Sequence, residues 1–281
     1  MKKIEFKKKI CKSWFQLLRN QICQEIQLFE TEGAKFKKNK WTRNKSRNLD
    51  LGGGEMSILR GNTFEKAGVN ISTVFGSIPS ELKGKIPGSD SSRSFWASGI
   101  SVVIHPFSPK IPAVHMNTRF IVTNKCWFGG GMDITPSDLT SKESKDLASF
   151  FHKKIKVACD KYGSEYYKKY KKWCDEYFYL PHRGEPRGLG GIFYDYLNSD
   201  DWEKDFEFTK EVGKTFIETY SKIVSKTINL EWNEKDKNLQ LHRRSRYTEF
   251  NLLHDRGTKF GLQTKGNVDA ILMSLPPSTG W

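Results

Sequence analysis

The 281-residue sequence is short of several features that would place it in a familiar class. Its longest apolar runs, such as 102–104, fall far short of the roughly 20 residues that a membrane span requires. It has no GxGxxG fingerprint, no phosphate-binding loop ending in Lys-Ser or Lys-Thr, and no HExxH pair. The motifs therefore support neither a dinucleotide site, nor a P-loop, nor a zinc hydrolase.

Cysteines are few, and signals for export are missing. The five cysteines form no CxxC pair, and their odd number leaves at least one thiol outside any disulfide scheme. The basic start, residues 1–6, is followed by no apolar segment or cleavage site, and it contains Glu5 among lysines rather than Arg and Ser. We therefore expect a protein of the cytoplasm.

Acidic residues are scarce relative to basic ones. Lys and Arg number 47 and Asp and Glu 32, so the formal net charge is +15. This excess predicts an anionic partner, but nucleic acid, anionic lipid and a polycarboxylate ligand would all be attracted. No zinc finger, RRM or helix-turn-helix pattern is present, and the lysines lie along helix exteriors, so we do not expect nucleic acid to be the partner. The 13% of aromatic residues indicates a folded chain.

The hydrophobic pattern predicts blocks of helices and strands rather than strict alternation. Apolar residues at spacings of three and four predict helices in four segments, and compact apolar runs predict strands in four others, whereas 34–48 reads as a solvated loop. The helices are expected at 10–29, 141–158, 166–177 and 212–228, and the strands at 100–104, 117–122, 246–254 and 269–275. This order favours an α+β fold with an antiparallel sheet, formed by a single domain over residues 1–281.

Candidate chemistry gathers near three glycine clusters, at 52–54, 129–131 and 188–191. Tight turns explain such clusters about as well as close approach of a ligand to the backbone. Asp133 follows the second cluster, and Arg183 and Arg187 flank the third. Carboxylate and guanidinium groups beside approachable backbone suit a flat, bulky ligand edged with carboxylates, because Arg binds carboxylates in a two-pronged fashion. The residues alone predict a pocket for an anionic ligand and name no reaction.

Nine stretches, in order, resemble the oxygen-dependent coproporphyrinogen-III oxidase family over nearly the whole chain. They are FEKAGVNIS at 64–72, GISVVIHP at 99–106, HMNTR at 115–119, WFGGGMDITP at 127–136, KWCDEYFYLPHRGE at 172–185, RGLGGIF at 187–193, RYTEFN at 246–251, DRGTKFGLQT at 255–264 and ILMSLPP at 271–277. No single one is specific, but a chance match to all of them is very improbable.

The resemblance implies an enzyme that converts two propionates of coproporphyrinogen III to vinyl groups with molecular oxygen, giving protoporphyrinogen IX. It implies no organic cofactor, and a large flat antiparallel sheet with helices on both faces, assembled as a homodimer. His115 is implied as a proton donor and Asp133 as the carboxylate that engages the pyrrole N–H groups. Substrate binding is implied for Ser101, Asn117, Thr118, Arg119, Lys265, Gly266 and Asn267, and we add Arg187 as a further propionate contact.

The same resemblance leaves a metal open. Some members are described as needing a divalent cation, with ligands that match His105, His115, His152 and His182, whereas others are described as metal-free. Because a metal-bound His115 could not also be a free acid, we rank the acid role higher. For His182, a dimer contact is the competing interpretation.

The sequence departs from the family pattern in four places. Asn267 stands where the family usually has Arg, the family's Phe-Asp-Asp-Leu is Tyr-Asp-Tyr-Leu at 194–197, and Cys126 stands for the first Trp of the family's Trp-Trp-Phe-Gly. Related chains are expected to continue past the position of Trp281 by a final helical segment that this sequence lacks.

Overall fold

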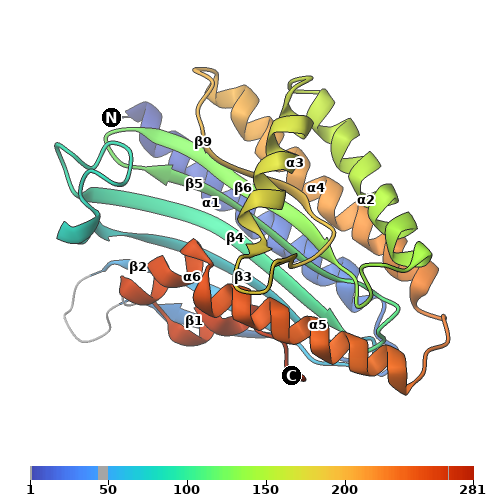
Figure 1. Ribbon diagram of the computed structural model, residues 1–281. Helices are drawn as coiled ribbons and strands as arrows, with labels where there is room; N and C mark the ends of the chain where they lie inside the picture. Colours follow the sequence, from blue (N-terminus) through green and yellow to red (C-terminus); the bar gives the residue numbers. More distant parts are fainter. Residues whose placement is uncertain (1, 44–49, 265) are drawn as a thin grey trace.

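The computed structural model describes residues 2–43, 50–264 and 266–281, and in these ranges seven strands form one antiparallel sheet (Figure 1). The strand order is β1-β2-β3-β4-β5-β6-β9, so chain neighbours are sheet neighbours except where β9 joins β6. The strands are β1 Lys37–Thr42, β2 Gly52–Leu59, β3 Phe64–Ser77, β4 Ser94–Pro106, β5 Ala113–Val122, β6 Cys126–Thr135 and β9 Gly191–Leu197. A separate short hairpin pairs β7, Tyr179–Leu180, with β8, Glu185–Pro186.

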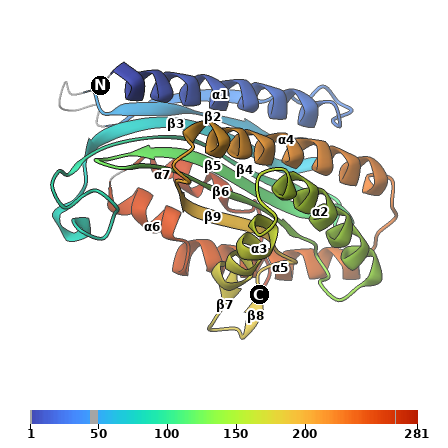
Figure 2. The ribbon, with the colours of Figure 1, turned by 90° about the horizontal axis from the view of Figure 1, so that it is seen from above.

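Helices cover both faces of the sheet, as the view from above shows (Figure 2). Helices α1 and α4 pack on one face with α2 beside them, α5 to α7 lie on the other face, and α3 lies along β9. The α-helices are α1 Lys2–Gln27, α2 Lys142–Asp160, α3 Tyr166–Tyr177, α4 Trp202–Thr227, α5 Glu234–Leu253, α6 Arg256–Gln263 and α7 Val268–Ile271, with 3₁₀ turns η1 Ser80–Leu82 and η2 Leu272–Ser274. The predicted α+β fold with helices on both faces of an antiparallel sheet is confirmed. No helix in these ranges has the length and apolar character needed to cross a membrane.

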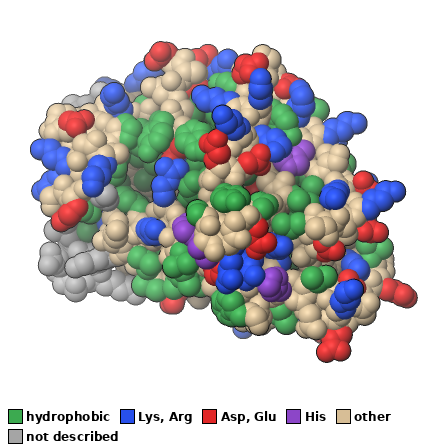
Figure 3. Space-filling view, in the orientation of Figure 1, with side chains coloured by type: hydrophobic (Ala, Val, Ile, Leu, Met, Phe, Trp, Pro, Cys, Tyr) green, Lys and Arg blue, Asp and Glu red, His purple; other side chains and the backbone are tan. Residues whose placement is uncertain are grey.

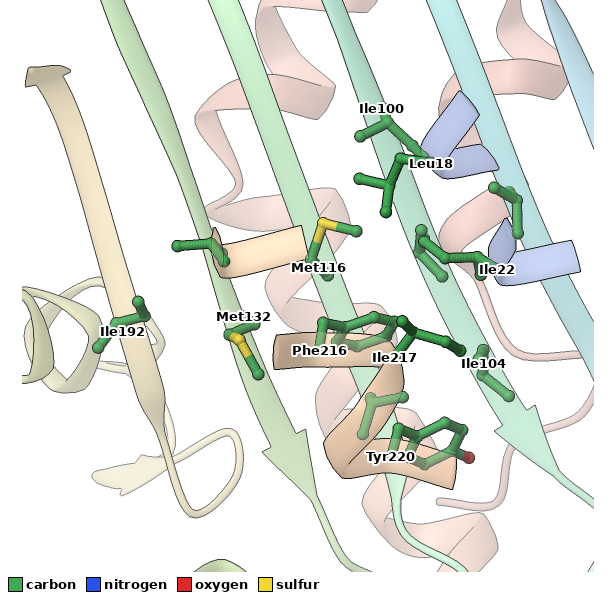
Figure 4. Close-up of a cluster of buried hydrophobic side chains, with 14 of the residues drawn as sticks. Leu18, Ile22, Ile100, Ile104, Met116, Met132, Ile192, Phe216, Ile217 and Tyr220 are labelled. Carbon is green, nitrogen blue, oxygen red and sulfur yellow. The ribbon is translucent and has the colours of Figure 1, made fainter. Parts of the chain in front are cut away.

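The larger core lies between the sheet and the α1–α4 layer (Figure 4). In α1, the predicted spacing brings Leu18 and Ile22 onto the sheet, and in α4 Phe216 and Tyr220 join them, each at most 1% exposed. Asp201 begins α4 by accepting a hydrogen bond from the Lys204 amide. Each fully buried apolar side chain of this size contributes about 1.5–3 kcal/mol, so this face stabilises the scaffold.

Strand periodicity assigns the two faces of β5 different tasks. Val114, Met116 and Phe120 are buried in the core of the α1–α4 layer. The residues between them alternate to the opposite face, where His115, Asn117 and Arg119 are partly exposed. The core therefore fixes the register that presents these polar side chains together.

Two predicted strands near the C-terminus are wrong. Residues 246–254 belong to α5 apart from its C-cap, and 269–275 are mostly α7 and η2. Helix α5 begins with a capping box in which Asn233 and Asp236 exchange side-chain-to-backbone hydrogen bonds. The capping box at 233–236 marks the start of a helix, and it lies before the segment 246–254 whose apolar residues indicated a strand.

The predicted loop at 34–48 is also wrong in part. Residues 37–42 form β1, which pairs with β2 at the edge of the sheet, while 44–49 lie outside the described residues. The lysines of β1 fit this edge position, because charge on an edge strand opposes pairing with a second sheet. The cluster at 129–131 is likewise no turn: all three glycines lie within β6, and none has a positive φ.

Candidate active site

On the face opposite the α1–α4 core, helices cover only part of the sheet. The part left free of helices lies across β3, β4 and β5 (Figure 1). Its centre carries small side chains, with Gly99 paired to both Ser72 and Arg119, and Ser101 paired to both Asn70 and Asn117. All of these residues are partly exposed. Figure 3 shows this face of the molecule, with hydrophobic and basic side chains between α3 and the loop that precedes β4. The surface formed by the paired residues is called the floor. It consists of Asn70, Ser72, Ala97, Gly99, Ser101, Asn117 and Arg119.

A chain of polar contacts runs from the floor into the protein. Arg119 Nη1 donates to Asn117 Oδ1 (3.0 Å), and Asn117 Nδ2 lies 3.1 Å from His115 Nε2. His115 Nδ1 lies 2.8 Å from Asp133 Oδ1, and Arg187 Nη2 donates to Asp133 Oδ2 at 2.5 Å. Side-chain exposure falls along the chain from 28% at Arg119 to 14% at His115 and 3% at Asp133. The chain thus connects a solvent-accessible guanidinium with a buried ion pair.

The direction of the hydrogen bonds follows from Arg119. A guanidinium only donates, so Asn117 must direct its carbonyl oxygen at Arg119 and its NH₂ group at His115. Nε2 of His115 then accepts, and Nδ1 carries the proton that is donated to Asp133. The contacts are therefore complete with a neutral His115 in one defined tautomer.

The pair of Asp133 and Arg187 is buried on all sides. Burial alone would raise the pKa of Asp133, but the Arg187 charge and the hydrogen bond from His115 outweigh it and hold this pKa below the ordinary value. The Arg187 guanidinium lies over the rings of Phe178, Tyr247 and Phe250, at 3.8, 4.6 and 4.9 Å from their centroids. Asp133 is consequently an anion whose counterion is permanently in place.

Most of the predicted site residues on the central strands come together. Ser101, Asn117, Arg119, His115 and Asp133 all face the same side of the sheet in adjacent strands. Two predicted substrate contacts are placed differently. The Thr118 side chain is fully buried on the core face, because it alternates with Asn117 and Arg119. Arg187 is 1% exposed behind Asp133, where the guanidinium cannot meet a propionate without leaving its ion pair.

The late substrate-binding run lies at the beginning of α7. Lys265 is outside the described residues. The Gly266 amide donates to the Gly261 carbonyl, and Asn267 caps α7 by accepting from the Ala270 amide (2.9 Å). Because Oδ1 of Asn267 serves the helix, this residue supplies a cap where the family's Arg would supply a positive charge.

The four histidines of the metal hypothesis are held apart by separate partners. Nε2 of His105 donates to the Ser274 carbonyl, and Nε2 of His152 to that of Leu189, both at 2.9 Å. His182 Nε2 lies 2.8 Å from Glu249 Oε2, and its Nδ1 contacts His254. Within the ranges that the structure describes, no three His, Cys, Asp or Glu side chains are grouped to hold a metal. The four residues therefore do not fit a single metal site.

A small, partly open cavity lies under α5, and it is distinct from the floor. It is lined by His105, Thr135, Arg243 and Tyr247 among others, and its volume of about 20 Å³ suits one water molecule. Nδ1 of His105, Oγ1 of Thr135 and the Tyr247 hydroxyl lack hydrogen-bond partners in the described structure. The cavity is too small for a ligand of several rings, so the open floor is the candidate binding surface.

Three contributors to the site were missed in the sequence. Asp195 of β9 forms an ion pair with Arg119 (Nη2–Oδ2 2.7 Å). Phe178 packs edge-on against His115, with ring centroids 6.0 Å apart, and also stacks on Arg187. Asn70, beside Ser101, has a buried Oδ1 without a described partner. Asn70 and Phe178 lie within the resembling stretches 64–72 and 172–185, and Asp195 lies in the departing run at 194–197, but nothing in these stretches marked the three residues as part of the site.

Comparison with known proteins gives a consistent result. The family model described as Coproporphyrinogen III oxidase matches residues 10–281. The oxygen-dependent coproporphyrinogen-III oxidase of Rickettsia africae is 54% identical over 278 residues, covering 96% of each chain. The protein of the same name from Rickettsia bellii is 53% identical over 277 residues, covering 98% of each. This chain belongs to the coproporphyrinogen III oxidase family.

Proposed function

We propose that this protein is an oxygen-dependent coproporphyrinogen-III oxidase of heme biosynthesis, which converts two propionates of coproporphyrinogen III to vinyl groups. The observation that carries the proposal is the floor with its chain of contacts from Arg119 to Arg187, found in a member of this family.

The floor suits a broad tetrapyrrole because few atoms project from it. Gly99 has no side chain, and Ala97 and Ser101 are small, so a ring can approach the strands over several residues. Asn70, Ser72 and Ser101 add polar side chains to this surface, and we propose that they are partners for the ring N–H groups and side chains of the substrate. A flat, hydrogen-bonding surface of this kind selects for shape as well as charge.

Arg119 is the propionate-binding residue in this proposal. It is the most exposed member of the chain of contacts, and it uses Nη1 for Asn117 and Nη2 for Asp195. A guanidinium carries five N–H donors, so donors remain for a carboxylate of the substrate. Binding there places the propionate beside Asn117, which lies between Arg119 and His115 in the chain of contacts.

Asp133 acts on the substrate through His115 in the described conformation. Its two oxygens already accept from His115 and Arg187, and its side chain is 3% exposed. We propose that it fixes the tautomer and ring orientation of His115, so that Nε2 faces Asn117 and the floor. When Asn117 moves to bind substrate, Nε2 of His115 is free to accept a proton and to return it. The family resemblance implies direct contact between Asp133 and the pyrrole N–H groups. In this proposal His115 lies between Asp133 and the substrate.

The chemical balance identifies what the site must admit. Conversion of each propionate to a vinyl group releases CO₂, one proton and two electrons. Two conversions therefore supply the four electrons and two of the four protons that reduce one O₂ to two H₂O, and the other two protons are taken up from solvent. Dioxygen is therefore the co-substrate, in keeping with the names of the relatives. No step is assigned to a metal, because the four histidines do not form one site.

We further propose a homodimer formed through the C-terminal helices, in a cytoplasmic enzyme consisting of a single domain. Leu252 and Leu253 at the end of α5, Leu262 in α6 and Val268 in α7 are each 41–54% exposed. Apolar side chains gathered on consecutive helices are typical of a protein interface. Light scattering should give twice the chain mass, and Leu253→Glu should lower it to the monomer value.

The experiment that tests the function is incubation with coproporphyrinogen III in air and under nitrogen. Protoporphyrin fluorescence after oxidation of the products should rise only in air. Asp133→Asn and Arg119→Ala should lose turnover while circular dichroism shows the wild-type fold. Absence of oxygen-dependent turnover with pure, folded, dimeric protein would refute the assignment. The rival role, nucleic-acid binding, predicts sequence-dependent affinity that persists at moderate salt, whereas charge attraction alone is lost there.

A further inference from the structure

The Arg119 side chain is held from a strand that is not its neighbour. Arg119 lies in β5 and Asp195 in β9, and strand β6 runs between them. Nη2 of Arg119 is nevertheless 2.7 Å from Oδ2 of Asp195. The two side chains therefore meet above β6, on the same face as His115 and Asp133.

Gly129 supplies the space for this contact. It is the β6 residue paired with Arg119, and a Cβ added there would lie 2.5 Å from Asp195 Oδ1 and 2.9 Å from Arg119 Nε. Distances under 3 Å are essentially never observed for a real Cβ atom. Because Gly129 does not have a positive φ, its backbone conformation does not require glycine. The contact explains the glycine: any side chain there would displace the ion pair.

A local irregularity of β9 aims Asp195. The β6–β9 register shifts between Phe128 and Gly130, and Tyr196 adopts a positive φ of 55°. The Tyr196 amide donates to Asp195 Oδ1 at 3.0 Å, which leaves Oδ2 for Arg119. Bulges of this kind redirect a side chain, and a non-glycine residue with a positive φ persists when its surroundings compensate for the strain.

We propose that Asp195 is a positioning residue that holds the Arg119 guanidinium for a substrate carboxylate, and that Gly129 is required because the pair lies across it. Asp195 also keeps the Arg119 orientation from which Nη1 reaches Asn117, and so supports the chain of contacts to His115. The inference rests on the proposed function for the identity of the ligand, but not for the geometry.

Charge and positioning predict opposite results when Asp195 is removed. Asp195→Ala takes away a negative charge near an anionic ligand, so charge alone would tighten binding. Positioning predicts weaker binding, because an unrestrained Arg side chain loses rotamer freedom when the ligand binds. Asp195→Asn separates the two effects, since it removes the charge but keeps one carbonyl oxygen that can accept from Arg119, while the Tyr196 amide loses its acceptor.

The probe is coproporphyrin III, the oxidised ring of the proposed substrate, whose binding can be followed by fluorescence without turnover. We expect Asp195→Ala and Gly129→Ala each to weaken binding about tenfold, which corresponds to about 1.4 kcal/mol, while Asp195→Asn stays within about threefold of wild type. Asp160→Ala is the matched control, because Asp160 forms an exposed ion pair with Lys156 on α2. It should bind as wild type does.

A thermodynamic cycle with Arg119→Ala distinguishes positioning from general stabilisation of the fold. In that background Asp195→Ala should cost nothing further, because Asp195 acts only through Arg119. An equal loss in both backgrounds, or tighter binding by Asp195→Ala, would overturn the inference. If wild type binds coproporphyrin III and Asp195→Ala binds it equally well, only this inference fails; if wild type does not bind it, the proposed function fails too.

Discussion

Replacement of Arg187 by Met tests whether the buried ion pair sustains the site. Met is similar in length and apolar, so the rings of Phe178, Tyr247 and Phe250 keep a packing partner while Asp133 loses its counterion. Breaking a buried pair by removing one partner typically costs about 3–5 kcal/mol, because an uncompensated charge remains. Against a total stability of about 5–15 kcal/mol for a natural protein, this loss is large.

The Asp133 contribution to stability should also depend on pH in opposite directions in the wild type and in Arg187→Met. In the wild type, the pKa of Asp133 lies below its unfolded value, so its contribution to stability is present above about pH 4 and is lost as the pH falls through the folded pKa. Without Arg187, burial raises this pKa instead, and the folded chain takes up a proton that the unfolded chain releases. The loss in free energy of unfolding caused by Arg187→Met should therefore be smaller at pH 5 than at pH 7.

Urea unfolding, followed by tryptophan fluorescence and far-ultraviolet circular dichroism, measures these free energies. The double variant Arg187→Met/Asp133→Asn should recover at least about 2 kcal/mol of the single-variant loss, since it removes both charges. Lys171→Met is the control, because Lys171 pairs with Asp175 at the surface and should cost under about 1 kcal/mol. Additive effects of the two buried substitutions, or a loss for Arg187→Met no greater than for Lys171→Met, would refute the reasoning.

Three further substitutions test other parts of the scaffold, the first two by urea unfolding and the third by hydrogen exchange. Burial lowers the pKa of His105 to about 3, so the unfolded chain binds a proton that the folded chain refuses. The His105 contribution should lower stability by about 4 kcal/mol from pH 6.5 to pH 3, and a slope unchanged in His105→Gln would contradict this. Asn233→Ala should cost about 1 kcal/mol by removing the α5 cap, and a neutral result would argue against the capping box. In Gly191→Ala the new Cβ would lie 1.9 Å from the Met132 carbonyl oxygen, so β9 should detach, which hydrogen exchange of the β9 amides would show; unchanged protection would disprove this.

The site could be predicted from the sequence where strand alternation decides the outcome. Once β5 is known to be a strand, His115, Asn117 and Arg119 must share a face, and the apolar residues between them identify the buried one. The same rule places the Thr118 side chain in the core, so its position away from the floor could have been predicted from the sequence alone. The family resemblance named a run of residues, whereas the sheet uses alternate ones.

Helix α5 could not be predicted from apolar spacing because its buried face is largely polar. Gln240, Arg244, Tyr247 and Asn251 recur at helical spacing and are all buried. Gln240 and Arg244 donate to the Pro106 carbonyl, so hydrogen bonds attach the helix to the end of β4. A search for apolar residues detects only the fragment at 246–254, where short spacing resembles a strand.

Asp195 illustrates the second limit of prediction from sequence. It lies 76 positions after Arg119 and reaches it only because β9 joins the sheet beside β6 and bulges at Tyr196. Gly129 shows the same dependence, since its neighbours in space are these two side chains. A glycine in a strand indicates that something lies close to the backbone, but the sequence does not say whether a ligand or the protein's own side chains fill that space.

The two ion pairs of the site have different energetic properties, and this changes how the +15 charge should be understood. Arg187 and Asp133 are buried, so exchanging Asp133 for another anion would cost several kcal/mol. Arg119 and Asp195 are partly exposed, at 28% and 13%, and such a pair contributes about 1 kcal/mol or less. A substrate carboxylate can therefore join Asp195 on the Arg119 guanidinium at little cost, but cannot displace Asp133. The four site charges cancel in the absence of substrate, so recognition depends on the position of one exchangeable guanidinium, while the surface lysines that produce the net charge act at long range.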